Sequence, residues 1–227
     1  HMDQLKLIRF VDQILTPVYK HIPYSHYSLT LRSLGKHNRT LLDAACGDGQ
    51  FMAMINKDHT YVATGADLFS PYLKKAKATG VYSRLIKADL RKLPFKPKSF
   101  DVVLCSQAIE HLTKKEGLAL IDSLSKLAKK RVLIITPAGE MPQDAYDGNI
   151  YQKHKSQWYA EDFTSRGFNV EGQGLKILYG TGNAVKQWGL ISYFFSLISL
   201  LLGPRLACKP NLGVYLFCWK DVNEKKK

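Results

Sequence analysis

The sequence predicts a three-layer α/β/α sandwich: a doubly wound, mostly parallel, seven-stranded sheet with an antiparallel last strand. From residue 40 onward, short apolar runs of strand length alternate with longer segments of helical periodicity. Continuous apolar strands separated by helices are typical of a parallel sheet that is covered on both faces. The first of these strands also leads into a glycine-containing turn that opens a helix, and right-handed crossovers then produce the doubly wound arrangement.

The individual elements follow from the spacing of apolar residues along the chain. Residues 4–22 carry apolar side chains at helical spacing and predict an amphipathic helix, followed by a tyrosine-rich connector over 24–27. A late helix over 159–166 ends at Gly167, because glycine commonly stops a helix. We further expect strands at 40–45, 61–66, 82–88, 100–105, 132–135, from 168 onward and at 213–219, and helices at 51–57, 71–79 and 115–129.

The predicted elements divide the chain into four parts. An N-terminal helical cap covers residues 2–38, and the α/β core covers 39–180. An apolar helical insert between strands six and seven occupies 181–211, and the last strand with a basic tail occupies 212–227. Connections as long as this insert are usually functional.

Composition excludes several classes of protein. Hydrophobic residues make up 45% of the 227 residues, which excludes a disordered chain. The first apolar run, residues 5–18, is interrupted by charged residues, so no signal peptide is expected. The four cysteines show no paired spacing and indicate reduced thiols rather than a disulfide frame or zinc site. These features predict a cytoplasmic protein.

The net charge of +14 is concentrated at the two ends of the chain. Residues 1–40 carry six basic and two acidic residues, and residues 171–227 carry eight and three. One interpretation is a solvated surface. The other is attraction to an anionic partner such as a phospholipid surface, a phosphorylated substrate or RNA.

The most informative motif is the turn after the first predicted strand. Asp43 precedes two closely spaced glycines, Gly47 and Gly49, which let a ligand approach the backbone. A dinucleotide fingerprint would need a third glycine where the chain has Met52. The run instead resembles motif I of class I S-adenosylmethionine-dependent methyltransferases. Ala45 stands where that family usually has its first glycine, and we expect a negative φ there.

Further motifs follow in the order of that family and extend the resemblance over residues 38–180. Asp67 ends the second strand, where the resemblance implies a contact with the ribose hydroxyls. Asp89 ends the third, where it implies a contact with the exocyclic amine of adenine. The family's turn for methylating amino groups of DNA bases and its Pro-Cys motif for pyrimidine C5 are both missing. The resemblance implies S-adenosylmethionine as cofactor, S-adenosylhomocysteine as product, and a cofactor-binding set of Asp43, Ala45, Gly47, Gly49, Asp67, Leu68, Asp89, Leu90, Ser106 and Gln107.

Glu110 and His111 follow the fourth predicted strand. With Gln107 they resemble the Glu-x-x-Glu-His metal site of ubiquinone-pathway O-methyltransferases and small-RNA 2′-O-methyltransferases, and His154 could supply a remote further ligand. Because the first acid of that motif is replaced by neutral Gln107, we expect no metal. His111 is then a candidate catalytic base for a hydroxyl acceptor, and the alternative is a hydrogen-bonded structural histidine.

The predicted insert contains an unusually apolar helix over residues 190–202. Ten of its residues are apolar, and its three serines lie on one stripe. At ~1.5 Å per residue it extends about 20 Å, too short for the ~30 Å hydrocarbon core of a membrane. The alternatives are a cover over the acceptor site, a helix in a membrane interface, a homodimer contact, or ordinary core packing.

Together these features favour methyl transfer to a small, hydrophobic or lipid-like acceptor, with O-, C- and N-methylation left open. The basic ends and the apolar helix favour peripheral contact with an anionic membrane. An RNA 2′-O-methyltransferase is the runner-up, and nucleic acid is less favoured because no RNA-binding module is attached. A cofactor-binding scaffold that partners another methyltransferase is the non-catalytic alternative.

Overall fold

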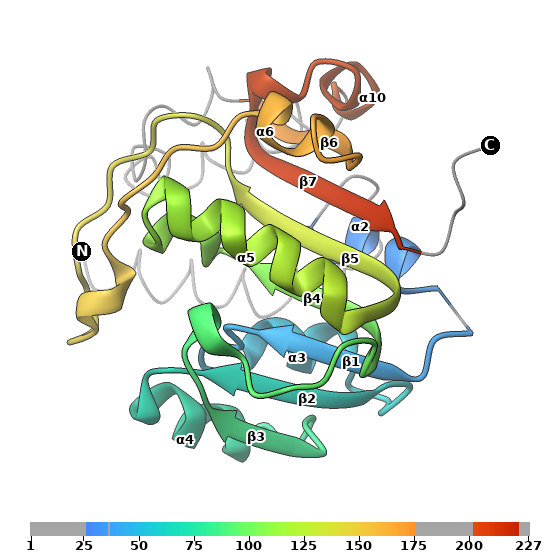
Figure 1. Cartoon of the computed structure of the whole chain (residues 1–227), viewed down its shortest axis with the longest axis vertical. Coiled ribbons are helices and arrows are strands. Elements are labelled where there is room, and N and C mark those ends of the chain that lie inside the picture. Colours follow the sequence, from blue (N-terminus) through green and yellow to red (C-terminus); the bar gives the residue numbers. More distant parts are fainter. Residues whose placement is uncertain (1–25, 36, 176–201, 223–227) are drawn as a thin grey trace, which may run out of the picture.

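The computed structural model describes residues 26–35, 37–175 and 202–222, which form one twisted sheet with helices on both sides (Figure 1). The strand order is β3-β2-β1-β4-β5-β7-β6. Strands β1 to β5 pair in parallel, and β7 runs antiparallel to both β5 and β6. The strands are β1 (Thr40–Ala44), β2 (Val62–Asp67), β3 (Arg84–Lys87), β4 (Phe100–Ser106), β5 (Ala128–Pro137), β6 (Asn169–Leu175) and β7 (Gly213–Asp221).

Two hydrophobic cores cover the two faces of the sheet. One is built by the long helix α5 and the shorter α6, and the other by α2 and α3. Figure 1 shows α5 in front of the sheet and α3 behind it. The helices are α2 (His26–Leu34), α3 (Gln50–Ile55), α4 (Ser70–Ala78), α5 (Lys114–Leu127), α6 (Ala160–Thr164) and α10 (Gly203–Ala207), with short 3-10 helices η1 (Leu90–Lys92), η2 (Ile109–His111), η3 (Ile150–Gln152) and η4 (Pro210–Leu212).

Helix α5 shows how local sequence and packing agree in this fold. Thr113 and Glu116 form a capping box at its first turn, which satisfies two backbone N–H groups. Leu120, Ile121 and Leu124 recur at helical spacing and are fully buried against the sheet. The helix therefore covers the first core between β4 and β5.

The structure confirms the predicted fold class, and the strand and helix boundaries differ from the predicted ones by a few residues. The largest shift is in β5, which begins at Ala128, directly after α5. The strand begins with the exposed residues Lys129 and Lys130, so its first part does not show up as an apolar run in the sequence. The connector expected over 24–27 is also partly wrong, because α2 begins at His26 and packs Leu29 into the second core.

Some predictions fall outside the residues that the structure describes. These are the helix over 4–22 and nearly all of the apolar helix over 190–202. The boundaries of the cap and the insert therefore stay predictions. In the described ranges, no helix is both long and apolar enough to cross a membrane.

Candidate functional site

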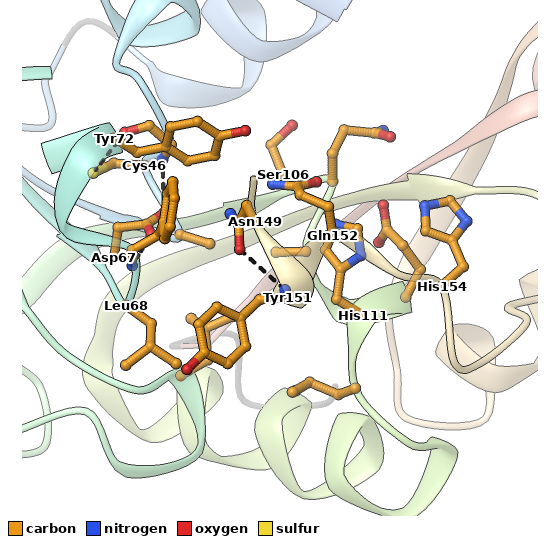
Figure 2. A pocket seen from close by; sticks show the side chains of 18 of the residues that line it. Cys46, Asp67, Leu68, Tyr72, Ser106, His111, Asn149, Tyr151, Gln152 and His154 are labelled. Atoms are coloured by element: carbon orange, nitrogen blue, oxygen red, sulfur yellow. Dashed lines mark hydrogen bonds between the residues drawn. The ribbon is translucent and has the colours of Figure 1, made fainter. Parts of the chain in front are cut away.

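The carboxyl ends of β1, β2 and β4 open into a cavity of about 670 Å³. This volume is in the usual range for small-molecule sites, and the edge is where ligands bind in open α/β sheets. Figure 2 shows Asp67 and Leu68 on one side of the cavity, and His111 and His154 on the other. The cavity lining includes all the predicted site residues except Gly49, namely Asp43, Ala45, Gly47, Asp67, Leu68, Asp89, Leu90, Ser106, Gln107 and His111.

The glycine turn after β1 shapes the floor of the cavity. Gly47 has φ +55, and a Cβ added there would meet no atom within 4 Å. Glycine is therefore favoured at this position by the backbone conformation and not by a lack of space. Gly49 is the N-cap of α3 with φ +81, and an added Cβ would lie 3.0 Å from the Cα of Ala76. Gly49 thus allows the turn to pack against α4 rather than contacting a ligand.

Ala45 contradicts the expectation of a negative φ, because its φ is 66. The chain leaves β1 at this residue, and the Cys46 N–H donates to the Ala66 carbonyl at 3.0 Å. This connection to β2 holds the turn in a left-handed conformation that an alanine Cβ disfavours. The position therefore has a backbone conformation that glycine adopts more readily than alanine.

Asp43 is a buried carboxylate beneath the turn. Its Oδ2 accepts a hydrogen bond from the Tyr82 hydroxyl at 2.7 Å. Burial raises the pKa of Asp43 to about 7, the Tyr82 bond opposes this shift, and Asp67 adds to it by repulsion. Tyr82, which the sequence analysis did not identify, is therefore the partner that orients Asp43.

Asp67 holds the turn and the start of the next helix together. Its Oδ2 accepts from the Gly47 N–H at 2.9 Å, and its Oδ1 accepts from the Phe69 N–H at 2.8 Å. Burial raises the pKa of Asp67, and these backbone bonds oppose the shift. Each oxygen keeps a further lone pair, so a carboxylate oriented in this way can also accept from ligand hydroxyls.

Asp89 is held by a neighbouring arginine. The Arg91 guanidinium donates to both carboxylate oxygens, with Nε at 3.0 Å from each, and also pairs with Glu116 on α5. The side-chain hydrogen bond from Arg91 is the main reason that the pKa of Asp89 is lowered. Asp89 is therefore ionised and fixed in orientation at the rim of the cavity.

The opposite side of the cavity holds Glu110, His111 and His154. One ligand atom from each lies within 4.8 Å of the others, so the three side chains could hold a metal ion. Glu110 is only 2% exposed, and burial raises its pKa to about 7. Burial, then repulsion by His154, lowers the pKa of His111 to about 4, so its ring is neutral at physiological pH.

Residues 138–155, which we call the strap, form a further wall, of which the sequence analysis identified only His154. Asp147 and Gly148 both have positive φ, and Tyr146 and Asn149 form a bridge on either side of them. An Asp-Gly pair between such residues is a recognised turn signal, so this part could have been found. Strap residues that line the cavity include Met141, Gln143, Tyr146, Asn149, Tyr151 and His154.

The strap is attached to α4 across the cavity. Lys75 pairs with Asp147 at 3.5 Å, and the Tyr72 hydroxyl contacts the side chains of Asp147 and Asn149. Burial is the largest cause that raises the pKa of Tyr72 to about 12. These contacts join residues about 75 positions apart in the sequence, which no local motif indicates.

Comparisons with known proteins agree with this geometry. Residues 42–136 match the model of a methyltransferase domain family. An uncharacterized protein of Methanocaldococcus jannaschii is 26% identical over 167 residues, which cover 72% of this chain and 67% of that protein.

Two solved structures are similar in fold. The plantazolicin methyltransferase BpumL in complex with SAH gives a TM-score of 0.54 at 17% identity, covering 98% of this chain and 91% of that one. A structure of a Haloferax volcanii putative methyltransferase with the Trm112 methyltransferase activator gives 0.55 at 14% identity, covering 97% and 99%. Residues 42–136 therefore form a methyltransferase domain, and the chain as a whole has the fold of these solved methyltransferases.

Proposed function

We propose that the cavity binds S-adenosylmethionine against the ends of β1, β2 and β3 and transfers its methyl group to a small acceptor held between His111 and the strap. The observation that carries this proposal is that residues predicted from four separate motifs line one cavity. Asp67 is proposed to accept from the ribose hydroxyls and Asp89 from the adenine amine. Ser106 lies between the two sides of the cavity in Figure 2, where the methyl group would face the acceptor.

The charge of the cavity supports a positively charged cofactor. Its lining carries seven carboxylates, but only Arg91 and Lys155 as basic residues. This excess is opposite in sign to the net charge of +14 for the whole chain. Carboxylates around a cavity favour a ligand with a sulfonium and an ammonium group.

The proposed reaction is a direct displacement. The acceptor atom forms a bond to the methyl carbon while the carbon–sulfur bond breaks. The electron pair of the broken bond stays on sulfur and gives S-adenosylhomocysteine, whose sulfur is neutral. Alignment and exclusion of water contribute most to such a displacement. For a hydroxyl acceptor, His111 is the proposed catalytic residue, because its neutral ring faces the cavity opposite Asp67.

The acceptor is proposed to be hydrophobic or lipid-like. Tyr146 and Tyr151 line the cavity and are 53% and 44% exposed, and Ile150 between them on the strap is 72% exposed. Exposed apolar side chains that are grouped beside a cavity indicate a binding surface, whereas single scattered ones do not. RNA 2′-O-methylation, the first alternative, draws support from the basic net charge and from the Glu110-His111 pair, whereas no described residue favours a non-catalytic scaffold.

The direct test is incubation of the purified chain with methyl-labelled S-adenosylmethionine and three acceptor pools: a lipid extract, a polar metabolite extract and RNA. We expect label in the lipid pool, and at least about tenfold less with His111→Ala, since a general base contributes about 10²–10⁴-fold. Label in RNA alone would overturn the proposed acceptor class. Cofactor binding without transfer to any pool would favour the scaffold.

A further inference from the structure

Glu110, His111 and His154, which we call the EHH cluster, come from η2 and from the strap. Glu110 and His111 are neighbours, whereas His154 arrives from 43 residues later. Their ligand atoms lie within 4.8 Å of one another, and the His111 and His154 ring centroids are 5.1 Å apart (Figure 2). Two imidazoles and a buried carboxylic group that converge in this way need a physical explanation.

The histidines are oriented by backbone carbonyl groups. His154 Nδ1 lies 2.6 Å from the Met141 carbonyl oxygen. A carbonyl oxygen only accepts, so the ring proton is on Nδ1 and the lone pair is on Nε2. His111 Nδ1 makes a longer contact of 3.4 Å with the Lys153 carbonyl oxygen. Metal-binding histidines are commonly fixed in this way, with one ring nitrogen bound to a backbone carbonyl group.

Glu110 supplies an unpaired buried oxygen. Its Oε2 accepts from the Thr136 hydroxyl at 2.9 Å, while Oε1 has no hydrogen-bond partner among the described residues. A buried polar atom without a partner costs about 1–3 kcal/mol, and more when charged. A cation coordinated by this oxygen would remove that cost.

We propose that the EHH cluster binds a divalent transition-metal ion of the zinc, iron, manganese or cobalt group in preference to Mg²⁺. Two imidazole nitrogens and one carboxylate suit these ions, whereas Mg²⁺ binds through oxygen ligands. The ligand atoms around zinc lie roughly 3.3–3.5 Å apart, given bond lengths of about 2.0–2.2 Å. The ligand atoms of the cluster are therefore already close together before an ion binds, and ion binding requires side-chain adjustments of about an ångström.

Gln107 explains why the sequence alone indicated no metal. It stands where the metal-binding motifs that this segment resembles have a carboxylate, and its Nε2 is buried without a partner in the described chain. A neutral amide is a weaker ligand than a carboxylate, so the site loses a charged oxygen ligand. His154 completes a three-ligand set that no longer includes position 107. Glutamine at position 107 in place of a carboxylate therefore shifts the expected ion preference of the site from Mg²⁺ towards ions that favour nitrogen ligands.

A bound ion would polarise an oxygen of the acceptor as a Lewis acid. A metal-bound His111 cannot accept a proton at the coordinating nitrogen, so its proposed role as a base applies to the ion-free chain and polarisation of the acceptor to the ion-bound chain. Ion binding does not depend on the proposed acceptor or on turnover. Failure of one proposal therefore leaves the other intact.

The test is calorimetric titration of the chelator-stripped full chain with Zn²⁺, Mn²⁺ and Mg²⁺ separately, without cofactor. Cys208→Ser removes the exposed thiol that could bind zinc on its own. We expect one Zn²⁺ per chain, bound at least about tenfold more tightly than Mg²⁺. His154→Ala and Glu110→Gln should each weaken Zn²⁺ binding by at least about 10–100-fold, because even indirect partners of a metal site contribute that much. Gln107→Glu should strengthen Mg²⁺ binding by at least about tenfold.

His37→Ala is the matched control, because His37 is exposed and does not line the cavity. Its Zn²⁺ affinity should equal that of the Cys208→Ser parent. Cobalt absorption bands that disappear in His154→Ala but persist in His37→Ala would support the site independently of activity. Zinc affinity that is unchanged by both His154→Ala and Glu110→Gln, or no binding of any of the three ions, would overturn the proposal.

Discussion

At the scale of single residues, the end of β1 carries two features that function would explain better than stability. Ala45 has φ 66, and Asp43, two residues earlier, is a carboxylate buried to 3% exposure. Strained backbone and buried charge both cost free energy and tend to occur at ligand sites. The turn after β1 is therefore expected to serve a ligand. The free energy that its strained backbone and buried carboxyl group cost can be measured as a change in the stability of the protein.

Replacing Ala45 by glycine should stabilise the protein. A left-handed conformation costs an L-residue about 1–2 kcal/mol, part of which is offset by the greater freedom of glycine in the unfolded chain. We expect the free energy of unfolding in urea to rise by about 0.5–1 kcal/mol. Ala44→Gly, in the buried strand next to it, should instead lower the free energy. A loss of stability in Ala45→Gly would show that the turn is not strained.

The buried Asp43 predicts a pH dependence of stability. Its pKa is raised from 3.8 to about 7, so between these values the native state binds a proton that the unfolded state releases. Stability contributed by this group is therefore present at low pH and lost as pH rises from about 4 to 7. Relative to Asp43→Asn, the wild type should lose about 2–4 kcal/mol between pH 4.5 and 8. Parallel curves of unfolding free energy against pH for the two proteins would contradict this assignment.

Asp67→Ala should weaken S-adenosylmethionine binding. The carboxylate is proposed to accept from the ribose hydroxyls, and a hydrogen bond to a charged group contributes about 1.5–3 kcal/mol. Calorimetric titration should therefore show an affinity loss of roughly 10–150-fold. Because Asp67 also accepts from the Gly47 N–H, Asp67→Asn serves as the control that preserves one acceptor oxygen. Unchanged affinity in Asp67→Ala would remove this residue from the cofactor site.

At the scale of elements, the strap is a part of the cavity wall that lies outside the parallel strands. The parallel strands supply the cofactor side, as in any doubly wound sheet, but the strap supplies the opposite wall and His154. Its attachment depends on a turn in which two residues have positive φ and on the pair of Lys75 with Asp147. This wall of the cavity is therefore a loop that is positioned by one helix.

Loosening the strap should affect the acceptor more than the cofactor. Gly148→Ala introduces a side chain at φ 66, where space is available but the backbone conformation is unfavourable, at a cost of about 1–2 kcal/mol. We expect the KM for the acceptor to rise several-fold while cofactor affinity changes less than twofold. Gly80→Ala is the matched control, because Gly80 has φ 72 and equal space but lies outside the strap. Equal effects of both variants would indicate general destabilisation instead.

At the scale of the whole molecule, a basic protein encloses an acidic cavity. The net charge of +14 is concentrated at the two ends of the chain, whereas the charged residues that line the cavity are mostly acidic. Such a distribution allows attraction to an anionic surface and retention of a cationic cofactor at the same time. It is consistent with the proposed lipid-like acceptor, which would be met at a membrane surface.

The protein should therefore sediment with anionic phospholipid vesicles and not with neutral ones. Each basic residue near such a surface contributes about 1 kcal/mol, and high salt should weaken this attraction only partly if apolar side chains also insert. Replacing Phe194, Phe195 and Ile198 by serine should reduce vesicle binding and leave cofactor affinity unchanged. A wild type that ignores anionic vesicles would refute the membrane prediction. If the triple variant instead unfolds, the helix predicted over residues 190–202 belongs to the protein core.

The sequence by itself determined the fold class, the glycine turn and the strand-end residues that line one side of the cavity. These depend on hydrophobic periodicity and on motifs within a few residues of each strand end, so they can be read locally. Only the tertiary structure decided the positive φ of Ala45, the bond from Tyr82 to Asp43 and the meeting of Glu110 with His154. Each of these depends on segments that are distant in sequence and brought together by packing of the sheet and strap. Their contacts form only when the hydrophobic cores bring those segments to the same edge.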